Sequence, residues 1–405
     1  MNPDHLIDTF LDLVAIESPS FHEAPMAAHC ARLLAELGFS VEFDDSAPRT
    51  GSDSGNLIAR LPGTAPGRLA LSAHLDTVRP CAGITVERAV VPGADLGPAY
   101  ADEGDVEVPR SAGDTILSAD DKAGIAAILE GVRATLEAGA PRPDLTVLLT
   151  TGEEESLRGS SALAEGALAW PVDLPSACGH DAAGASGEGS LPCYVLDADG
   201  RPGTVIVGAP CHWTMDAVFH GRAAHAGVEP EAGVSAIALA AAAVASMALG
   251  RLDEATTANV GVIDGGSAVN VVPAACRVQG ECRSLHPERA EAQRDAMTLA
   301  CEQAAALGGG SVEMAWRRDY PAVLVGEDDP LVAHAMAAAR AAGLEPRLAR
   351  TGGGADANVL GEKGAHAVTL GIGMANFHSV DEFIAVADLE ADARWVEALI
   401  AAYAE

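Results

Sequence analysis

The chain has 405 residues, which is long enough to bury a large hydrophobic core and to form two or more domains. Its 25 Lys and Arg residues are outnumbered by 58 Asp and Glu residues, which gives a formal net charge of −33. This acidity argues against nucleic acids and anionic membranes as partners, because both are bound through basic surface.

Several features of the sequence are typical of a reduced, cytoplasmic protein. The eight cysteines are scattered and show no Cys-x-x-Cys spacing. The chain opens with Asn2-Pro3-Asp4, which indicates the start of a helix rather than an export signal. The apolar run at residues 234–249 is mostly alanine and rather short for a bilayer span, so we interpret it as a well-packed helix of a soluble protein.

The N-terminal part of the chain alternates between helical and extended patterns. Helical spacing of apolar residues predicts helices at residues 3–15, 23–37, 121–137 and near Ser160. Short apolar runs predict strands at residues 40–43, 56–61, 69–75 and 145–150. Residues 80–113 are rich in Gly, Pro and Asp, and we expect a long loop there. The alternation predicts an α/β domain with a mainly parallel sheet flanked by helices.

The pattern changes at about residue 211 and returns to the first type at about residue 317. Between these points we expect strands at 214–219, 257–262, 269–272 and 276–283, with helices at 230–249 and 287–307. After them we expect helices at 330–342 and 389–403 and strands at 346–350 and 367–370. The prediction is therefore one domain built from residues 1–210 and 317–405, with an inserted α+β domain at residues 211–316.

The stretch around His74 carries the first candidate site. The apolar run at residues 69–75 predicts a buried strand that carries His74 and Asp76 to its end, and their i, i+2 spacing places both side chains on the same face. The ends of such strands form active sites in open α/β sheets. We interpret His74 as a metal ligand and Asp76 as the residue that holds its imidazole in the right tautomer. Without further support, the pair would be better explained as a strand end with polar residues.

Four further stretches place acidic or imidazole side chains near the ends of apolar runs. They are residues 117–124 with Asp120, residues 150–155 with three glutamates, residues 194–200 with Asp197, and residues 377–379 with His378. Taken singly, Asp120 could be a helix cap and the glutamate run a solvated helix start. Together the stretches supply two imidazoles and three or more carboxylates, a ligand set that suits a pair of zinc-like ions.

These five motifs, in this order, resemble those of the M20 family of dizinc metallopeptidases, from about residue 5 to about residue 400. Three stretches are similar to the peptidase T-like branch, that of tripeptide aminopeptidases: Ala-Asp-Asp-Lys-Ala-Gly-Ile at 119–125, Gly-Arg-Ala-Ala-His-Ala-Gly at 221–227 and Thr-Gly-Gly-Gly-Ala-Asp-Ala-Asn at 351–358. The resemblance implies a zinc-peptidase-like catalytic domain, with the insertion as a lid that commonly carries a dimer interface.

The resemblance also assigns roles to the motif residues. Asp120 would bridge two ions, His74 and Asp197 would complete one metal site, and Glu154 and His378 would complete the other. In the family, the peptide bond between the paired acids, here Asp120 and Asp121, is often cis.

The catalytic base implied by the resemblance is Glu153, which would take a proton from a water that bridges the ions. Three consecutive glutamates also allow Glu154 and Glu155 as base and ligand, but the spacing from Thr150 favours Glu153 and Glu154. A second alternative concerns Asp197. Asp181, in a segment at residues 171–192 rich in Pro, Gly, Ser and Ala, competes with it, and we prefer Asp197 because it follows an apolar strand.

Other residues are candidates for contact with substrate. His225 matches the lid histidine that polarises the scissile carbonyl in this family, and that can come from the partner subunit. Asn270 and Arg283 could hold a substrate carboxylate or backbone, although a structural salt bridge would equally explain Arg283. Gly353 and Gly354 would let backbone N–H groups approach a peptide terminus, with a plain turn as the alternative.

The sequence thus predicts a hydrolase that cleaves short peptides, in particular an aminopeptidase acting on tripeptides. An N-acyl amino acid deacylase or carboxypeptidase of the same family is the first alternative, and a catalytically inactive metal- or peptide-binding protein is the second. The expected cofactors are two divalent ions, with Zn²⁺ favoured and Co²⁺ or Mn²⁺ as alternatives. We expect a small peptide as substrate and a homodimer formed through the lid domain.

Overall fold

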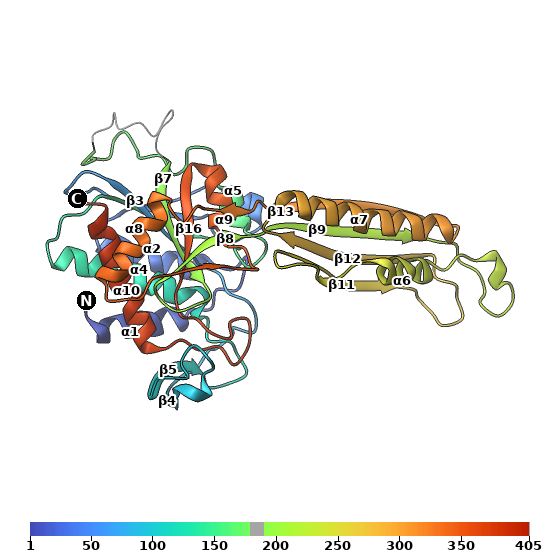
Figure 1. The fold of residues 1–405 in the computed structure, drawn as a ribbon, viewed down its shortest axis with the longest axis horizontal. Helices are drawn as coiled ribbons and strands as arrows, with labels where there is room; N and C mark the ends of the chain where they lie inside the picture. Colours follow the sequence, from blue (N-terminus) through green and yellow to red (C-terminus); the bar gives the residue numbers. More distant parts are fainter. Residues whose placement is uncertain (179–189, 405) are drawn as a thin grey trace. The chain divides into compact units, whose positions relative to one another are not determined.

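The computed structural model describes residues 1–178 and 190–404, which fold into two compact units (Figure 1). The first unit comprises Met1–Val207, Val325–Thr351 and Ala355–Glu405, and the second comprises Gly208–Leu324 and Gly352–Gly354. The chain passes from the first unit to the second between residues 207 and 208, three residues before the predicted boundary at 210/211. It returns to the first unit between residues 324 and 325, eight residues after the predicted boundary at 316/317.

The first unit is built on a sheet with the strand order β1-β2-β6-β3-β7-β16-β8, and β15 also pairs with β8. The strands are β1 (Ser40–Phe43), β2 (Leu57–Leu61), β3 (Arg68–His74), β6 (Asp144–Thr150), β7 (Leu191–Ala198), β8 (Thr204–Ala209), β15 (Arg347–Arg350) and β16 (Ala365–Gly371). The central strands β6, β3, β7 and β16 run parallel, and the strands outside them pair antiparallel. The predicted α/β class is therefore confirmed, with the parallel pairing at the centre of the sheet.

Helices cover both faces of this sheet because its buried strands alternate their side chains between two apolar clusters. Leu69, Leu71 and Ala73 of β3 join the larger cluster, whereas Ala70 joins the smaller one. The helices of this unit are α1 (Pro3–Val14), α2 (Ala24–Glu36), α3 (Ala47–Thr50), α4 (Ala119–Glu137), α5 (Arg158–Ala162), α8 (Pro330–Ala341), α9 (Ala357–Leu360) and α10 (Val386–Ala402). Helices α1, α2, α4, α8 and α10 contribute to the larger cluster and α9 to the smaller one.

The segment predicted as a long loop at residues 80–113 contains a hairpin. Strand β4 (Val86–Pro92) pairs antiparallel with β5 (Asp105–Ser111). The side chains of Val106 and Val108 on β5 are buried in a small apolar cluster with Tyr100 and Phe383. The prediction was wrong because the segment packs against Phe383, near the C-terminus. The Gly/Pro-rich composition of the segment does not indicate this burial.

The second unit is a sheet with the order β10-β11-β12-β9-β13, packed against two helices (Figure 1). Its elements are β9 (Cys211–His220), α6 (Ala236–Ser246), β10 (Gly250–Arg251), β11 (Thr256–Gly265), β12 (Ala275–Ser284), α7 (Pro287–Leu307) and β13 (Ser311–Tyr320), followed by β14 (Val323–Leu324), which pairs with Gly208 and Ala209. Buried side chains of β9, β12, α6 and α7 form one apolar cluster. The opposite face of this sheet carries charged side chains such as Asp216 and Arg277.

Two predictions for this unit were wrong. The helix predicted at residues 230–249 is interrupted, because a short 3-10 turn at Pro230–Ala232 precedes α6. Gly233, which lies between them, has an extended backbone with φ −91° and ψ 164°. The next residue, Val234, exchanges backbone hydrogen bonds of 2.8 and 2.9 Å with Arg222, so this segment forms an isolated bridge instead of continuing the helix. The strand predicted at residues 269–272 is reduced to a single bridge between His225 and Val271.

Within residues 1–178 and 190–404, no helix combines the length and the apolar character that crossing a bilayer requires.

A close helix crossing in the first unit gives a testable prediction. At Gly131 of α4, an added Cβ would lie 2.6 Å from Val396 Cγ1 and 2.9 Å from the Ala393 carbonyl oxygen, both on α10. We expect Gly131→Ala to force the helices apart and to lower the free energy of unfolding by about 1–3 kcal/mol, measured by urea unfolding.

The matched control is Gly361→Ala. Gly361 has φ −59° and ψ −36°, and a Cβ there would meet no atom within 4 Å. This variant should stay within about 0.5 kcal/mol of the wild-type protein. Equal stability of the two variants would contradict the close packing of α4 and α10.

Candidate metal centre and active site

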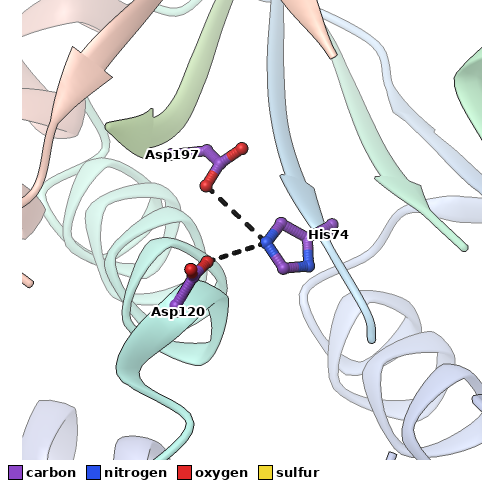
Figure 2. A group of neighbouring side chains, drawn as sticks. All are labelled: His74, Asp120 and Asp197. Atoms are coloured by element: carbon purple, nitrogen blue, oxygen red, sulfur yellow. Dashed lines mark hydrogen bonds and ion pairs between the residues drawn. The ribbon is translucent and has the colours of Figure 1, made fainter. Parts of the chain in front are cut away.

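The candidate ligands converge because neighbouring parallel strands end at one edge of the first unit's sheet. β6, β3 and β7 are adjacent and parallel, β3 ends at His74, and β7 carries Asp197 near its end. Helix α4 begins at Ala119 and brings Asp120 to the same place. Figure 2 shows His74 pointing toward both Asp120 and Asp197. The first predicted ligand group is therefore assembled from three separate elements, as is usual at the carboxyl edge of an α/β sheet.

Two groups of candidate ligand atoms share Asp120. In the first, His74 Nε2 lies 2.9 Å from Asp120 Oδ1 and 3.6 Å from Asp197 Oδ1. In the second, His378 Nε2 lies 3.3 Å from Asp120 Oδ2 and 2.9 Å from Glu154 Oε2. Within each group the ligand atoms all lie within 4.8 Å of one another. The two oxygens of Asp120 thus face different histidines, so each oxygen could bind a different cation.

The charges at this site are strongly coupled. Burial raises the pKa of Asp197 to about 7 despite the nearby His74. Burial likewise raises the pKa of Glu154, with the Asp120 carboxylate adding to the effect. Hydrogen bonds to Asp120 and Glu154 raise the pKa of His378 to about 10. Bound cations would reduce the repulsion between the carboxylates that surround the two imidazoles. A set of two imidazole nitrogens and three carboxylates fits a pair of zinc-like divalent cations.

Asp76, which was predicted to orient the His74 imidazole, also binds the backbone of the glutamate loop. His74 Nδ1 lies 2.9 Å from the backbone oxygen of Asp76 and 3.4 Å from its carboxylate. The same carboxylate accepts the backbone N–H of Glu153 at 2.9 Å and that of Glu154 at 3.3 Å. It also accepts the hydroxyl of Ser20 at 2.7 Å. Asp76 therefore ties the histidine of one ligand group to the backbone of the acid pair, a link that no sequence motif indicated.

Side chains from far along the sequence also hold the start of the acid-pair loop. Asn56 Oδ1 accepts the N–H of Thr151 at 3.1 Å, and Glu23 Oε1 accepts the N–H of Gly152 at 2.9 Å. Both acceptor side chains are buried. Together with Asp76, they bind four consecutive backbone N–H groups, from residue 151 to residue 154, so the loop needs no strand partner to satisfy them.

The three glutamates of this loop have different environments. Glu154 takes part in the second ligand group, Glu153 is buried, and Glu155 is exposed. Burial raises the pKa of Glu153 well above its usual value, and the Asp197 carboxylate raises it further. The arrangement agrees with Glu153 and Glu154 as the functional pair. The competing aspartate, Asp181, lies outside the described residues.

The Asp-Asp-Lys-Ala-Gly motif has a local structural explanation. The peptide bond between Asp120 and Asp121 is cis, as the family resemblance implied. Asp121 accepts the backbone N–H of His74 at 3.1 Å and that of Gly124 at 3.2 Å. A Cβ at Gly124 would lie 2.3 Å from the Asp121 carboxylate, so only glycine fits there. Lys122 is fully buried and donates to the Ile16 carbonyl at 2.7 Å, so it links α4 to the chain segment that follows α1.

The second unit holds the predicted substrate residues in two separate groups. His225 pairs with Val271 in an isolated bridge, and the Ala226 N–H donates to the Asn270 carbonyl at 3.0 Å, so His225 and Asn270 lie on neighbouring loops. Both residues are exposed. The His225 loop leaves β9 next to β12, where the Gly221 N–H donates to the Ala274 carbonyl.

Arg283 lies at the other end of β12, next to a tyrosine. Its Nη1 donates to Tyr320 Oη at 3.4 Å, and a Cβ at Gly354 would lie 2.4 Å from the Tyr320 ring. Arg283 and the Gly354 backbone therefore both lie against the tyrosine side chain. Eight strand positions, or about 26 Å, separate Ala275 from Arg283 along β12. Within this unit the structure therefore brings Arg283 and Gly354 together and keeps them apart from the His225 loop.

A charged cluster around Arg283 was not predicted from the sequence. Arg283 Nε donates to Glu281 Oε2 at 2.7 Å, and His212 Nε2 lies 2.5 Å from the same oxygen. The His212 ring packs against the Tyr320 ring at 5.3 Å between centroids. A signal was present in the alternation of β12, which places Glu281 and Arg283 on one face, but their partners come from β9 and β13.

The chain is similar to known proteins over its whole length. The sequence model of peptidase family M20/M25/M40 matches residues 118–402. The uncharacterized protein YqjE of Bacillus subtilis is 36% identical over 403 residues, which cover 99% of this chain and 98% of that protein. The crystal structure of aminopeptidase PepT from Bacillus cereus matches at 34% identity and a TM-score of 0.83, with 100% of both chains covered. That of a tripeptidase from Staphylococcus aureus matches at 32% identity and a TM-score of 0.85, over 100% of this chain and 99% of that chain.

The charged cluster predicts a pH-dependent contribution to stability. Burial alone raises the pKa of Glu281, but His212 and Arg283 outweigh it and lower the pKa from 4.5 to about 2. A depressed carboxyl pKa stabilises the folded protein above pH 4.5, and this stabilisation is lost as the pH falls from 4.5 toward 2. We expect Glu281→Gln to cost on the order of 2 to 3 kcal/mol at pH 7, and to cost progressively less below pH 4.5, measured by urea unfolding across pH.

Asp216→Asn is the control for this prediction. Asp216 pairs with Arg277 on the same sheet, but in an exposed position where ion pairs contribute about 0–1 kcal/mol. A cost of Glu281→Gln that stays constant from pH 7 to pH 3 would show that the ionised carboxylate is not what stabilises the cluster.

Proposed function

The chain belongs to peptidase family M20/M25/M40, and we propose that within this family it is a dinuclear-metal aminopeptidase that acts on tripeptides. The family makes it a metal-dependent peptidase. The narrower assignment is supported by similarity to an aminopeptidase PepT and to a tripeptidase over essentially the full length of each.

The observation that carries the proposal is the shared carboxylate of Asp120. One oxygen lies 2.9 Å from His74 Nε2 and the other 3.3 Å from His378 Nε2, so a single side chain joins both ligand groups. His74, Asp120 and Asp197 would hold one ion, and Asp120, Glu154 and His378 the other. Zn²⁺ is the favoured ion because nitrogen and carboxylate ligands suit it, and Co²⁺ or Mn²⁺ are alternatives.

Two such ions, when bound, would supply Lewis-acid activation of a water and of the scissile carbonyl. The chain's own contribution begins with Glu153, whose carboxylate would accept a proton from the attacking water and pass it to the leaving amine. Two features suit it to this task. Burial raises the pKa of Glu153 well above its usual value, which makes its carboxylate a stronger proton acceptor. The bond from its N–H to Asp76 fixes its backbone next to the candidate ligand Glu154.

The substrate-contacting residues of the proposal lie in the second unit. Arg283 would pair with a carboxylate of the peptide, and the backbone N–H groups of Gly353 and Gly354 would bind its polar terminus. His225 would donate to the carbonyl oxygen of the scissile bond, and Asn270 would hold the substrate backbone nearby. The distance of about 26 Å along β12 between the two groups supports a site in which His225 comes from a second copy of the chain, within a homodimer.

The proposed location is the cytoplasm. All eight cysteines are unpaired, and seven of them are buried. Free thiols persist in a reducing compartment, which supports this placement.

Substrate class and metal dependence test the proposal together. Protein stripped with a chelator should hydrolyse no tripeptide, and two equivalents of Zn²⁺, Co²⁺ or Mn²⁺ per chain should restore turnover. The panel contains tripeptides, dipeptides, tripeptides with a blocked amino terminus, and N-acyl amino acids, with product analysis to identify the released residue. Preferential turnover of N-acyl amino acids would instead identify a deacylase. Release of the C-terminal residue would identify a carboxypeptidase. No turnover by protein that holds two ions would identify a binding protein.

The roles of the glutamates make a second prediction. Glu153→Gln should lower kcat by about 10²–10⁴-fold, because the proton acceptor is lost, while two ions still bind. Glu155→Gln changes an exposed neighbour of the same chemistry and should leave kcat within about twofold. Kinetics on a tripeptide and metal analysis of each variant would check this. Loss of activity in Glu155→Gln with retention in Glu153→Gln would move the functional pair to Glu154 and Glu155.

A further inference from the structure

The loop that carries His378 is closed on itself. The backbone groups of Ala375 and Phe383 exchange two hydrogen bonds, of 3.0 and 3.1 Å, which bring the ends of the loop together. Inside it, the Glu382 N–H donates to the Ser379 carbonyl at 3.2 Å, and the Ser379 hydroxyl donates to the Asn376 carbonyl at 2.7 Å. His378 and Glu382 therefore belong to one compact loop, and a constraint on Glu382 is also a constraint on the backbone that carries His378.

The side chain of Glu382 binds the backbone just before and at Asp120. Its Oε2 accepts the N–H groups of Leu117 and Ser118, each at 2.8 Å, and its Oε1 accepts the N–H of Asp120 at 3.0 Å. The side chain is fully buried. Ser118 has a φ of 65°, a left-handed conformation that non-glycine residues adopt only when their surroundings hold them there. Three hydrogen bonds to one buried carboxylate supply such a hold.

We infer that Glu382 is a positioning residue that sets the separation between His378 and Asp120, and thereby the second ligand group. Asp120 and His378 are 258 positions apart in the sequence. Glu382, which lies in the His378 loop, links that loop directly to the backbone of Asp120 through a hydrogen bond. The inference rests on the proposed function, because it concerns how the chain holds the ions of that site. No family motif identified in the sequence assigned a role to this residue.

The alternative explanation is that Glu382 only satisfies backbone N–H groups near the start of α4. A carboxylate at a helix N-terminus stabilises the helix whatever lies beside it. The two explanations differ in what they predict for metal binding. A capping residue affects stability alone, whereas a positioning residue also affects the affinity for the ion held by Asp120, Glu154 and His378.

The test uses Glu382→Gln, which replaces one acceptor oxygen with an NH₂ group and so cannot accept bonds on both sides. Glu130→Gln is the matched control. Glu130 is also a buried glutamate, and it accepts the Asn2 N–H at 2.9 Å and bonds His5 at 2.8 Å, at a position on α4 remote from the ligands. Zinc is titrated into chelator-stripped full-length protein by calorimetry. Hydrogen exchange of the amides of residues 117, 118 and 120 is followed in the metal-free state.

We expect faster amide exchange at these three positions in Glu382→Gln. The dissociation constant of the ion held by Asp120, Glu154 and His378 should rise about 10- to 100-fold. Glu130→Gln should change neither quantity by more than about twofold. Should Glu382→Gln fail to fold, as judged by circular dichroism, Glu382→Asp replaces it. That variant keeps the charge but is one methylene too short to reach both sets of amides.

Each outcome is decisive. Faster exchange with wild-type zinc affinity would reduce Glu382 to a capping residue and overturn the inference. Unchanged exchange and unchanged affinity would overturn the bonding arrangement as well. If the wild-type protein bound none of Zn²⁺, Co²⁺ and Mn²⁺, the proposed function would fail. That result is distinct from a wild-type protein that binds two ions while Glu382→Gln binds them equally well.

Discussion

The constraint on which the structure depends is the burial of several carboxyl groups in one place. Asp120, Asp121, Glu153, Asp197 and Asp356 are all removed from water, or nearly so. Among the described residues, His74 and the half-exposed His378 form ion pairs with Asp120 and Asp197 of this group. Burial raises the pKa of Asp121, Asp197 and Asp356, because unpaired buried charge is costly by several kcal/mol per ion. A core that concentrates negative charge in this way is accounted for by cations that bind between the carboxylates. The chemistry of the site and the electrostatics of the fold therefore lead to the same conclusion.

A second regularity is that the ligand-bearing loops are held by side-chain acceptors rather than by strand pairing. Loops that leave a sheet edge expose backbone N–H groups that must find partners once they are buried. Asp76, Glu23 and Asn56 provide partners for residues 151–154, and Glu382 does so for Leu117, Ser118 and Asp120. The acceptors are themselves fixed by burial. Each candidate ligand is thus held by its own backbone, and that backbone is held by a buried acceptor side chain. This arrangement limits the movement of the ligands even when no ion is bound.

The sequence was sufficient for the parts of the site that follow from local pattern. His74 and Asp197 could be found because each lies near the end of an apolar run, and parallel strands meet at their carboxyl edge. Glu382 and Tyr320 could not, because their roles depend on partners 262 positions away in one case and 37 in the other. The hairpin formed by β4 and β5 was missed for a similar reason, since its burial depends on Phe383. Local periodicity predicts which side chains reach an edge, but not which distant side chain holds them.

The geometry of β12 gives the second unit a divided role under the proposed function. One end of the strand positions Arg283, packed with Tyr320 and Gly354, and the other adjoins the loop of His225. A strand is stiff, so the two ends of β12 stay about 26 Å apart. A single tripeptide cannot touch both ends, because three extended residues cover only about 10 Å. Each copy would then use one end for its own substrate and lend the other to its partner. Dimer formation would then be required for catalysis. Neither copy alone could supply both the arginine that binds the peptide and the histidine that donates to its scissile carbonyl.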